Sequence, residues 1–150
     1  MINIVQGDLF QSSAQTLVNT VNLVGVMGKG IALEYKKRYP EMFTKYKKIC
    51  DSKLFSMGQL YLYKTDEKWI LNFPTKQDWR NPSKTEYLEL GLKKFIETYK
   101  EKGITSIAFP LLGANNGGLD PKVSLEIMCK FLTQCDIPIY IYDNQNITFP

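Results

Sequence analysis

The sequence predicts a single α/β domain over residues 1–150, on three observations. Short runs rich in β-branched and aromatic residues alternate with longer segments whose apolar residues recur at helical spacing. A length of 150 residues with 44% apolar composition suits one hydrophobic core. No internal repeat, low-complexity tract or linker divides the chain.

The first third of the chain predicts two strands and two helices. The strands cover 2–5 and 17–24, and a helix runs from about residue 30 to 39. A second helix begins at Pro40, because the residue before proline avoids the helical region and proline suits a first helical position. Its expected buried side chains are those of Met42, Phe43, Tyr46, Ile49 and Cys50.

Four further strands are expected downstream. Residues 59–63 and 69–73 flank a short polar segment, which predicts a β-hairpin. Residues 104–109 form an apolar run typical of a buried strand, and 137–142 close the alternating pattern. We assign no element to residues 143–150.

Two helices lie between these strands. Ser83 with Glu86 three residues later predicts a capping box, and the helix behind it ends at Gly103. Asp120 and Pro121 suit the cap and first turn of the next helix. The expected buried side chains of the two helices are Leu88, Leu92, Phe95, Ile96 and Tyr99, then Val123, Ile127, Met128 and Phe131.

The composition excludes several classes of chemistry. The chain has no histidine, which removes Ser-His-Asp and Cys-His catalysis and His-ligated zinc. Its three cysteines show no CxxC spacing, so we expect no disulfide framework, no metal site and no cofactor. No signal peptide or membrane span is visible. These features predict a soluble protein of the reducing cytoplasm.

The positive charge is concentrated in one segment. The formal net charge is only +4, yet between residues 29 and 53 eight basic residues face three acidic ones. This segment could form a basic face that binds nucleic acid, or it could be an ordinary solvated helix surface.

Two glycine-bearing loops, residues 25–32 and 113–119, each follow an expected strand and precede an expected helix. Backbone N–H groups and the helix dipole favour an anion at that position, and two such loops predict a diphosphate site. Neither the Walker A pattern nor GxGxxG fits the first loop. The alternative is that the glycines only form tight turns.

Other polar residues follow expected strands. Asn19 and Asn22 interrupt an apolar strand, and we expect both amides on one face, bonded either to a ligand's hydroxyls or to the neighbouring loop. Asp8 could accept a hydrogen bond from an exocyclic amine, or could simply form a turn. Lys76 and Arg80 lie among aromatic residues within 72–80, which indicates either a site or a surface loop.

Four motifs in this order resemble a macrodomain, the ADP-ribose-binding α/β fold. They are Gly7-Asp8-Leu9, Val18-Asn19-Thr20-Val21-Asn22, residues 25–32 and residues 112–120. Within that superfamily, Asn72-Phe73-Pro74-Thr75-Lys76 with Trp79-Arg80 resembles the DNA ADP-ribosyl glycohydrolase antitoxins of the DarG type, which group with the terminal ADP-ribose glycohydrolases. The resemblance implies a three-layer sandwich, with a mixed central sheet flanked by helices and ADP-ribose at the strand ends.

The resemblance also implies roles for single residues. Asp8 would bind the adenine amino group with the Leu9 N–H near the ring, Asn22 would orient the distal ribose, and Lys76 would carry catalysis as nucleophile or acid. The diphosphate would be wrapped by two sets of residues: Met27, Gly28, Lys29, Gly30 and Ile31, and Gly113, Ala114, Asn115, Asn116, Gly117, Gly118 and Leu119.

The sequence departs from the family pattern in places. The related antitoxins usually have histidine at the position of Asp78 and Cys-Gly at Ala114-Asn115. Some terminal glycohydrolases use a loop aspartate where this chain has Gly117, so Asp120 is assigned to helix capping. The family's further C-terminal domain finds no room in 150 residues, which implies a free-standing role.

The expected function is removal of ADP-ribose from a nucleobase, most simply thymidine in single-stranded DNA, in an antitoxin-like role. Expected partners are ADP-ribosylated substrate, single-stranded DNA and a DNA ADP-ribosyltransferase toxin, with the chain itself a monomer that contacts no membrane. One alternative is a phosphatase of ADP-ribose 1″-phosphate or a hydrolase of ADP-ribosyl esters. Another is a reader that binds ADP-ribose without turnover.

Overall fold

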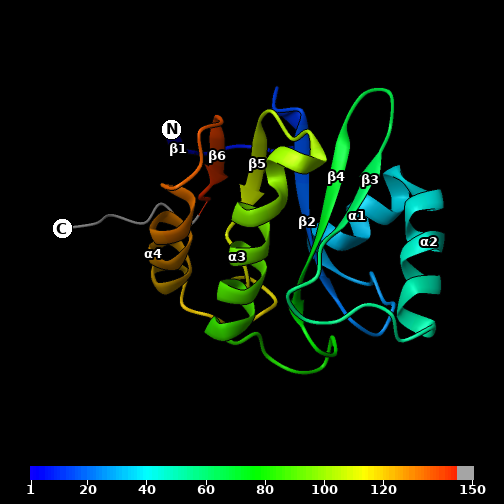
Figure 1. Cartoon of the computed structure of the whole chain (residues 1–150). Helices are drawn as coiled ribbons and strands as arrows, with labels where there is room; N and C mark the ends of the chain where they lie inside the picture. The colour runs from blue at the N-terminus through cyan, green and yellow to red at the C-terminus, as the bar shows by residue number, and fades with distance from the viewer. Residues whose placement is uncertain (145–150) are drawn as a thin grey trace.

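The computed structural model describes residues 1–144 and has three layers, a mixed sheet between two pairs of helices (Figure 1). The strands are β1 (Ile2–Val5), β2 (Thr16–Asn22), β3 (Tyr61–Lys64), β4 (Trp69–Lys76), β5 (Ile107–Pro110) and β6 (Ile139–Tyr142). The helices are α1 (Gly30–Arg38), α2 (Pro40–Asp51), α3 (Thr85–Lys102) and α4 (Pro121–Leu132), with a 3-10 turn η1 (Leu9–Gln11). The α/β class and the expected order of elements are confirmed.

The sheet order is β1-β6-β5-β2-β4-β3. The β3–β4 pair is antiparallel, which confirms the hairpin, and the other pairs are parallel. The carboxyl ends of the parallel strands therefore meet along one edge of the sheet, where ligands of open α/β sheets bind.

Each face of the sheet carries its own core. The larger core lies between the sheet and α3 with α4, which run side by side in Figure 1. The smaller core packs Tyr35 of α1 and Met42, Tyr46 and Cys50 of α2 against β2, β4 and β5. The burial of Met42, Tyr46 and Cys50 confirms the stripe that the sequence predicts for α2, while Phe43 and Ile49 are partly buried.

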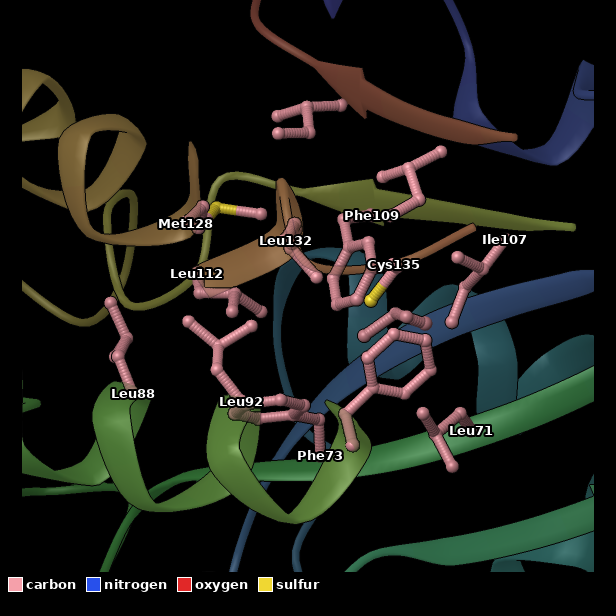
Figure 2. Packing of buried hydrophobic residues seen from close by; sticks show 14 of the residues in the cluster. Leu71, Phe73, Leu88, Leu92, Ile107, Phe109, Leu112, Met128, Leu132 and Cys135 are labelled. Carbon is pink, nitrogen blue, oxygen red and sulfur yellow. The ribbon is translucent and has the colours of Figure 1, made fainter. Parts of the chain in front are cut away.

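The larger core depends on a close approach of α3 to β4 (Figure 2). A Cβ placed on Gly91 of α3 would lie 2.3 Å from Cζ of Phe73, so only glycine leaves room for this ring. Phe95 then packs edge-on against Phe109, with 5.6 Å between ring centroids. The glycine in mid-helix thus sets the distance between the helix and the sheet.

The expected capping box is wrong. Helix α3 begins at Thr85, and its N-cap residue Lys84 makes no side-chain capping bond. Ser83 lies one residue further out and is buried, and its N–H donates to the Gly117 carbonyl oxygen at 2.8 Å. Its Oγ has no hydrogen-bond partner within residues 1–144. Ser83 therefore supports the loop after β5 instead of capping the helix.

Helix α4 begins as expected, because the Asp120 side chain accepts a hydrogen bond from the Lys122 N–H at 2.9 Å and Pro121 follows the cap. The expected burial of Val123 is wrong, since this side chain is 36% exposed. The buried stripe of α4 is Ser124, Leu125, Met128 and Leu132. Ser124 turns inward because its Oγ donates to the Leu112 carbonyl oxygen at 2.6 Å.

The first strand is joined to the last. Strand β1 forms an edge of the sheet and pairs with β6, and Gly7 and Asn144 exchange hydrogen bonds of 2.9 and 3.0 Å just beyond the strands. Residues 145–150, which belong to the tail left unassigned above, lie outside the described part. Over residues 1–144, no helix has the length and apolar character needed to cross a bilayer.

Candidate active site

A cavity of about 610 Å³ opens at the carboxyl ends of the parallel strands. Thirteen of the sixteen site residues expected from the sequence line it: Asp8, Leu9, Asn22, Gly28, Lys29, Gly30, Ile31, Lys76, Gly113, Ala114, Asn115, Asn116 and Gly117. They come from five segments that are far apart in the chain, so the fold brings the predicted residues together.

Met27, Gly118 and Leu119 do not line the cavity. Met27 is 1% exposed and belongs to the smaller core, where the Asn19 amide contacts its sulfur at 3.8 Å. The N–H groups of Gly118 and Leu119 bond back to the carbonyl oxygens of Ala114 and Gly113, so these two residues close the second loop from behind. Ligand contact at these three positions stays a prediction, while in the structure their contacts support the two loops.

The first glycine loop leads into α1. Lys29 is the N-cap of α1 and makes no side-chain capping bond. In the described part of the chain, the N–H groups of Gly28 and Lys29 have no acceptor. Free N–H groups at the positive end of a helix dipole attract an anion. The loop therefore offers one half of a diphosphate site.

The second glycine loop follows β5. Within residues 1–144, the N–H groups of Asn116 and Gly117 have no acceptor. Gly117 has no room for a side chain, because a Cβ would lie 2.3 Å from the Gly113 oxygen and 2.5 Å from Ser83 Oγ. The two loops meet across the cavity, since a Cβ on Gly30 would lie 2.8 Å from Nδ2 of Asn116. Free donors from both loops thus face one space.

The two asparagines of β2 contribute differently. Asn19 is fully buried, and its Nδ2 donates to Oδ1 of Asn72 at 3.0 Å. Asn22 lines the cavity, and its Oδ1 accepts the N–H groups of Val24 and Val26 at 3.1 and 3.3 Å. Asn19 contacts Met27 and Asn22 contacts Tyr46, and both partners belong to the smaller core, although three positions separate the two asparagines.

The hydroxyl of Tyr46 holds Asn22 in place. It lies 2.7 Å from the Asn22 carbonyl oxygen and 2.9 Å from Oδ1 of Asn22. Burial raises the pKa of Tyr46, so this hydroxyl stays protonated. Nδ2 of Asn22 donates one hydrogen bond to the Val26 carbonyl oxygen at 2.8 Å, and an amide has a second hydrogen to donate. Asn22 therefore holds the first loop, and its second amide hydrogen has no acceptor within residues 1–144.

The β1 end of the cavity is formed by residues around Asp8. The Asp8 side chain accepts a hydrogen bond from the Phe10 N–H at 2.9 Å and so caps η1. Its carboxylate remains exposed at the cavity. Tyr142 and Asn144, from the last strand and just beyond it, line the same end. This end combines an acceptor with apolar and aromatic surface.

The opposite end of the cavity holds Lys76, the last residue of β4. Partial burial lowers the pKa of its ammonium, and the positive charge of Lys29 lowers that pKa further. Its Nζ donates to the Trp79 carbonyl oxygen at 3.2 Å. The pairing of β2 with β4 shifts register between Val21 and Asn22. Lys76 is therefore the partner of Asn22, and the two residues lie side by side at this end of the cavity.

Sequence reasoning missed a further group of cavity residues. Five of them, Phe10, Pro110, Leu111, Tyr142 and Asn144, lie in none of the motifs described above. The other six lie inside those motifs but were not expected to contact a ligand: Gly7, Thr20, Val21, Val26, Ala32 and Thr75. Thr75, Pro110 and Tyr142 stand at strand carboxyl ends, so their place in the strand order is the signal that could have identified them.

The basic segment 29–53 lies mainly outside the cavity. Of its eight basic residues, only Lys29 is part of the lining. Arg38 pairs with Glu34 and Lys47 with Asp51, each at 2.9 Å on exposed helix surface. Within residues 1–144, no cluster of histidine, cysteine or carboxylate side chains could hold a metal ion.

Comparisons with known proteins agree with this geometry. A DNA ADP-ribosyl glycohydrolase of Mycobacterium tuberculosis is 46% identical over 147 residues, which are 95% of this chain and 42% of that protein. A DNA ADP-ribosyl transferase-DNA ADP-ribosyl glycohydrolase fusion protein of Thermosipho africanus is 38% identical over 160 residues, covering 94% of this chain and 41% of the fusion. The chain thus spans about two fifths of the length of these curated relatives.

Among solved structures, Thermosipho africanus DarTG in complex with ADP-ribose superimposes with a TM-score of 0.92 at 38% identity. This match covers 99% of the present chain and 43% of the other. The expected three-layer fold is therefore confirmed. The family model of the Macro domain matches residues 18–128, and the chain belongs to the Macro domain family.

Proposed function

We propose that this chain binds ADP-ribose in the cavity and hydrolytically removes it from a nucleobase, the thymine of thymidine, in single-stranded DNA. The observation that carries the proposal is the meeting of Lys76 with both glycine loops in one cavity of about 610 Å³. The names of the relatives support the reaction class, and the Thermosipho africanus complex supports the ligand.

We orient the ligand by the order of the strands along the cavity. We place adenine near Asp8 and Leu9, where an exposed carboxylate can accept the exocyclic amine. The diphosphate then lies on the N–H groups of the two loops, 28–31 and 113–117. The distal ribose reaches Asn22 and Lys76.

The chemistry follows from the position of Lys76. Burial and Lys29 lower its pKa, so more of the amine is neutral and nucleophilic than in an ordinary lysine. The neutral Nζ attacks C1″ of the distal ribose, the bond to thymine breaks, and the base leaves with a proton. Water then hydrolyses the lysine–sugar adduct, which releases ADP-ribose and restores the amine. Asn22 orients the sugar during these steps.

The biological setting extends the same proposal. The Thermosipho africanus relative joins a transferase and a glycohydrolase in one protein, so we propose an antitoxin-like role against a DNA ADP-ribosyltransferase. The chain would act in the cytoplasm as a monomer. Neither a metal ion nor a cofactor takes part in the proposed steps.

The test measures release of ADP-ribose from single-stranded DNA that carries it on thymidine, with wild type, Lys76→Ala and Lys93→Ala. Lys93 is an exposed lysine of α3, outside the cavity, and serves as the matched control. ADP-ribose binding is measured in parallel by calorimetry on all three proteins. We expect turnover to be lost only in Lys76→Ala, while all three still bind ADP-ribose.

Other outcomes select other functions. Binding without turnover in wild type would favour a reader. Turnover of ADP-ribose 1″-phosphate or of ADP-ribosyl esters, with DNA inert, would favour the phosphatase or ester hydrolase. Full activity of Lys76→Ala would remove this lysine from the mechanism.

A further inference from the structure

Trp79 is a large aromatic side chain that remains 48% exposed at the mouth of the cavity. The other tryptophan, Trp69, is partly buried, with the ammonium of Lys64 4.3 Å from its ring centroid. Exposed apolar surface beside a ligand cavity is typical of an interaction site. The indole is therefore available to a molecule that extends out of the cavity.

The loop that carries Trp79 is fixed at several points. The Leu23 N–H donates to the Gln77 carbonyl oxygen at 3.2 Å, and the Asn81 N–H to that of Asp78 at 3.0 Å. Nζ of Lys76 donates a hydrogen bond to the carbonyl oxygen of Trp79 itself. A preordered loop loses little conformational entropy on binding, so the indole can act as a rigid platform.

Arg80 completes this platform. Its Nε and Nη2 form a bidentate pair with Asp78 at 3.0 and 2.9 Å, and its guanidinium lies 5.2 Å from the centroid of the Trp79 ring. These hydrogen bonds lower the pKa of Asp78 to about 2, so the pair stays ionised. Within residues 1–144, two of the five guanidinium N–H groups form hydrogen bonds, and the side chain is 67% exposed. The remaining donors suit a phosphate oxygen.

The position of the platform indicates what it contacts. Asp8 follows β1, Lys76 ends β4, and four strand spacings of ~4.8 Å separate these strands in the sheet, roughly 19 Å. If adenine occupies the Asp8 end, the distal ribose lies near Lys76. Trp79 then lies beside the group that is attached to this ribose and released by the reaction. A flat aromatic ring beside a cation matches a nucleobase and its neighbouring phosphate, and a carboxylate or hydroxyl side chain offers no ring to stack.

We propose that Trp79 stacks on a nucleobase of a single strand of nucleic acid at the mouth of the cavity, and that Arg80 binds the adjoining phosphate. The pair then selects ADP-ribose linked to nucleic acid over ADP-ribose linked to protein. This inference rests on the proposed function for its direction, and it assigns the substrate's strand to a surface outside the sugar and diphosphate sites.

The first experiment observes the platform without any reaction. In Trp69→Phe, Trp79 is the single tryptophan of the chain, so its fluorescence reports contact directly. We expect unmodified oligothymidylate to quench this fluorescence at low salt, and Arg80→Ala to weaken the quenching. Absence of quenching at all oligonucleotide concentrations would overturn the inference.

The second experiment compares Trp79→Ala, Trp79→Phe and Leu90→Ala. Leu90 is 49% exposed on α3, outside the cavity, and so matches the exposure of Trp79. Stacking worth 1–3 kcal/mol predicts that Trp79→Ala raises KM for ADP-ribosylated oligonucleotide by roughly 5- to 150-fold. Trp79→Phe should restore part of the loss and Leu90→Ala should change nothing. The dissociation constant for free ADP-ribose should stay unchanged in all three.

The outcomes separate this inference from the proposed function. Quenching by oligonucleotide without any turnover would support the platform and contradict the DNA glycohydrolase. Turnover with an unchanged KM in Trp79→Ala would support the glycohydrolase and overturn the platform. An equal loss toward an ADP-ribosylated peptide would also overturn it, because Trp79 would then serve the sugar and not the strand.

Discussion

Lys76 and Lys29 line one cavity, where partial burial lowers the pKa of the Lys76 ammonium and the positive charge of Lys29 lowers it further. The proposed nucleophile is the neutral amine, so its supply grows as pH rises through this pKa. The positive charge of Lys29 therefore helps to set the pH range in which the amine of Lys76 is neutral.

The Lys29→Gln variant tests this coupling. Removal of the positive charge should raise the pKa of Lys76, so the acid limb of kcat against pH should move to higher pH. Because kcat is measured at saturating substrate, this shift in pKa is kept apart from any loss of substrate affinity at the first loop. Lys37→Gln, on the exposed surface of α1, is the control. A profile that keeps its position in Lys29→Gln would show that the amine is not the titrating group.

Asp8 is expected to bind adenine through its charge. Asp8→Asn keeps a side-chain oxygen to cap the Phe10 N–H but loses the negative charge. Loss of a charge-assisted hydrogen bond should weaken ADP-ribose binding by about 1.5 to 3 kcal/mol. Calorimetry with ADP-ribose measures this, and ribose 5-phosphate, which lacks adenine, should bind both proteins equally. An unchanged affinity for ADP-ribose would place adenine elsewhere.

Gly117 should tolerate no side chain. In Gly117→Ala the Cβ would collide with the Gly113 oxygen and with Ser83 Oγ, so the second loop must move and lose its alignment of N–H groups. We expect ADP-ribose binding to fall at least tenfold. Gly118→Ala is the matched control, because its φ of +79° makes alanine strained while nothing lies within 4 Å of its Cβ.

The Gly118→Ala control should lose about 1 kcal/mol of stability and keep its affinity for ADP-ribose. Equal binding losses in both variants would mean that Gly118 contacts the ligand, contrary to its place behind the loop.

Tyr46 is expected to act as a positioning residue for Asn22. Tyr46→Phe removes a hydroxyl that lies 2.7 Å from a buried carbonyl oxygen, which should lower the free energy of unfolding by about 1 to 3 kcal/mol. Urea denaturation measures this loss. ADP-ribose binding at low temperature, where the variant remains folded, should also weaken because Asn22 and the first loop lose a fixed point. Tyr63→Phe makes the same chemical change on β3 and should alter neither quantity.

Gly91→Ala tests the contact between α3 and the sheet. Alanine favours a helix by about 1 kcal/mol over glycine, yet its Cβ would lie 2.3 Å from Cζ of Phe73. We expect overpacking to prevail, with a net loss of about 1 to 3 kcal/mol in urea denaturation. The double variant Gly91→Ala/Phe73→Leu should recover part of this loss, since leucine vacates the space. A more stable Gly91→Ala protein would contradict the packing described.

Sequence patterns predicted the fold where local physics decides it. The proline at the start of α2, the aspartate cap of α4 and the hairpin of β3 and β4 all depend on residues within a few positions of one another. The capping box failed for the opposite reason. Ser83 is held by Gly117, which lies 34 positions away, and no local pattern contains that hydrogen bond.

The candidate site shows the same limit. The two glycine loops and Lys76 belong to motifs that are each visible within one continuous segment of the sequence. Tyr142 and Asn144 carry no motif, and only the pairing of β6 with β1 and β5 brings them to the cavity. The burial of Met27 was not predicted, because periodicity does not show which residue of a glycine-rich loop turns inward.

The hydrogen bonds that join Gly7 to Asn144 have a kinetic consequence. Both residues line the cavity, and 137 positions separate them in the chain. Contacts of such high sequence separation form late and slow the folding of a domain. A nascent chain can order the hairpin and α3 early, but the Asp8 end of the cavity, where we propose that adenine binds, closes only after β6 has docked against β1. Competence to bind nucleotide should therefore appear as the last step of refolding, later than the recovery of helical structure.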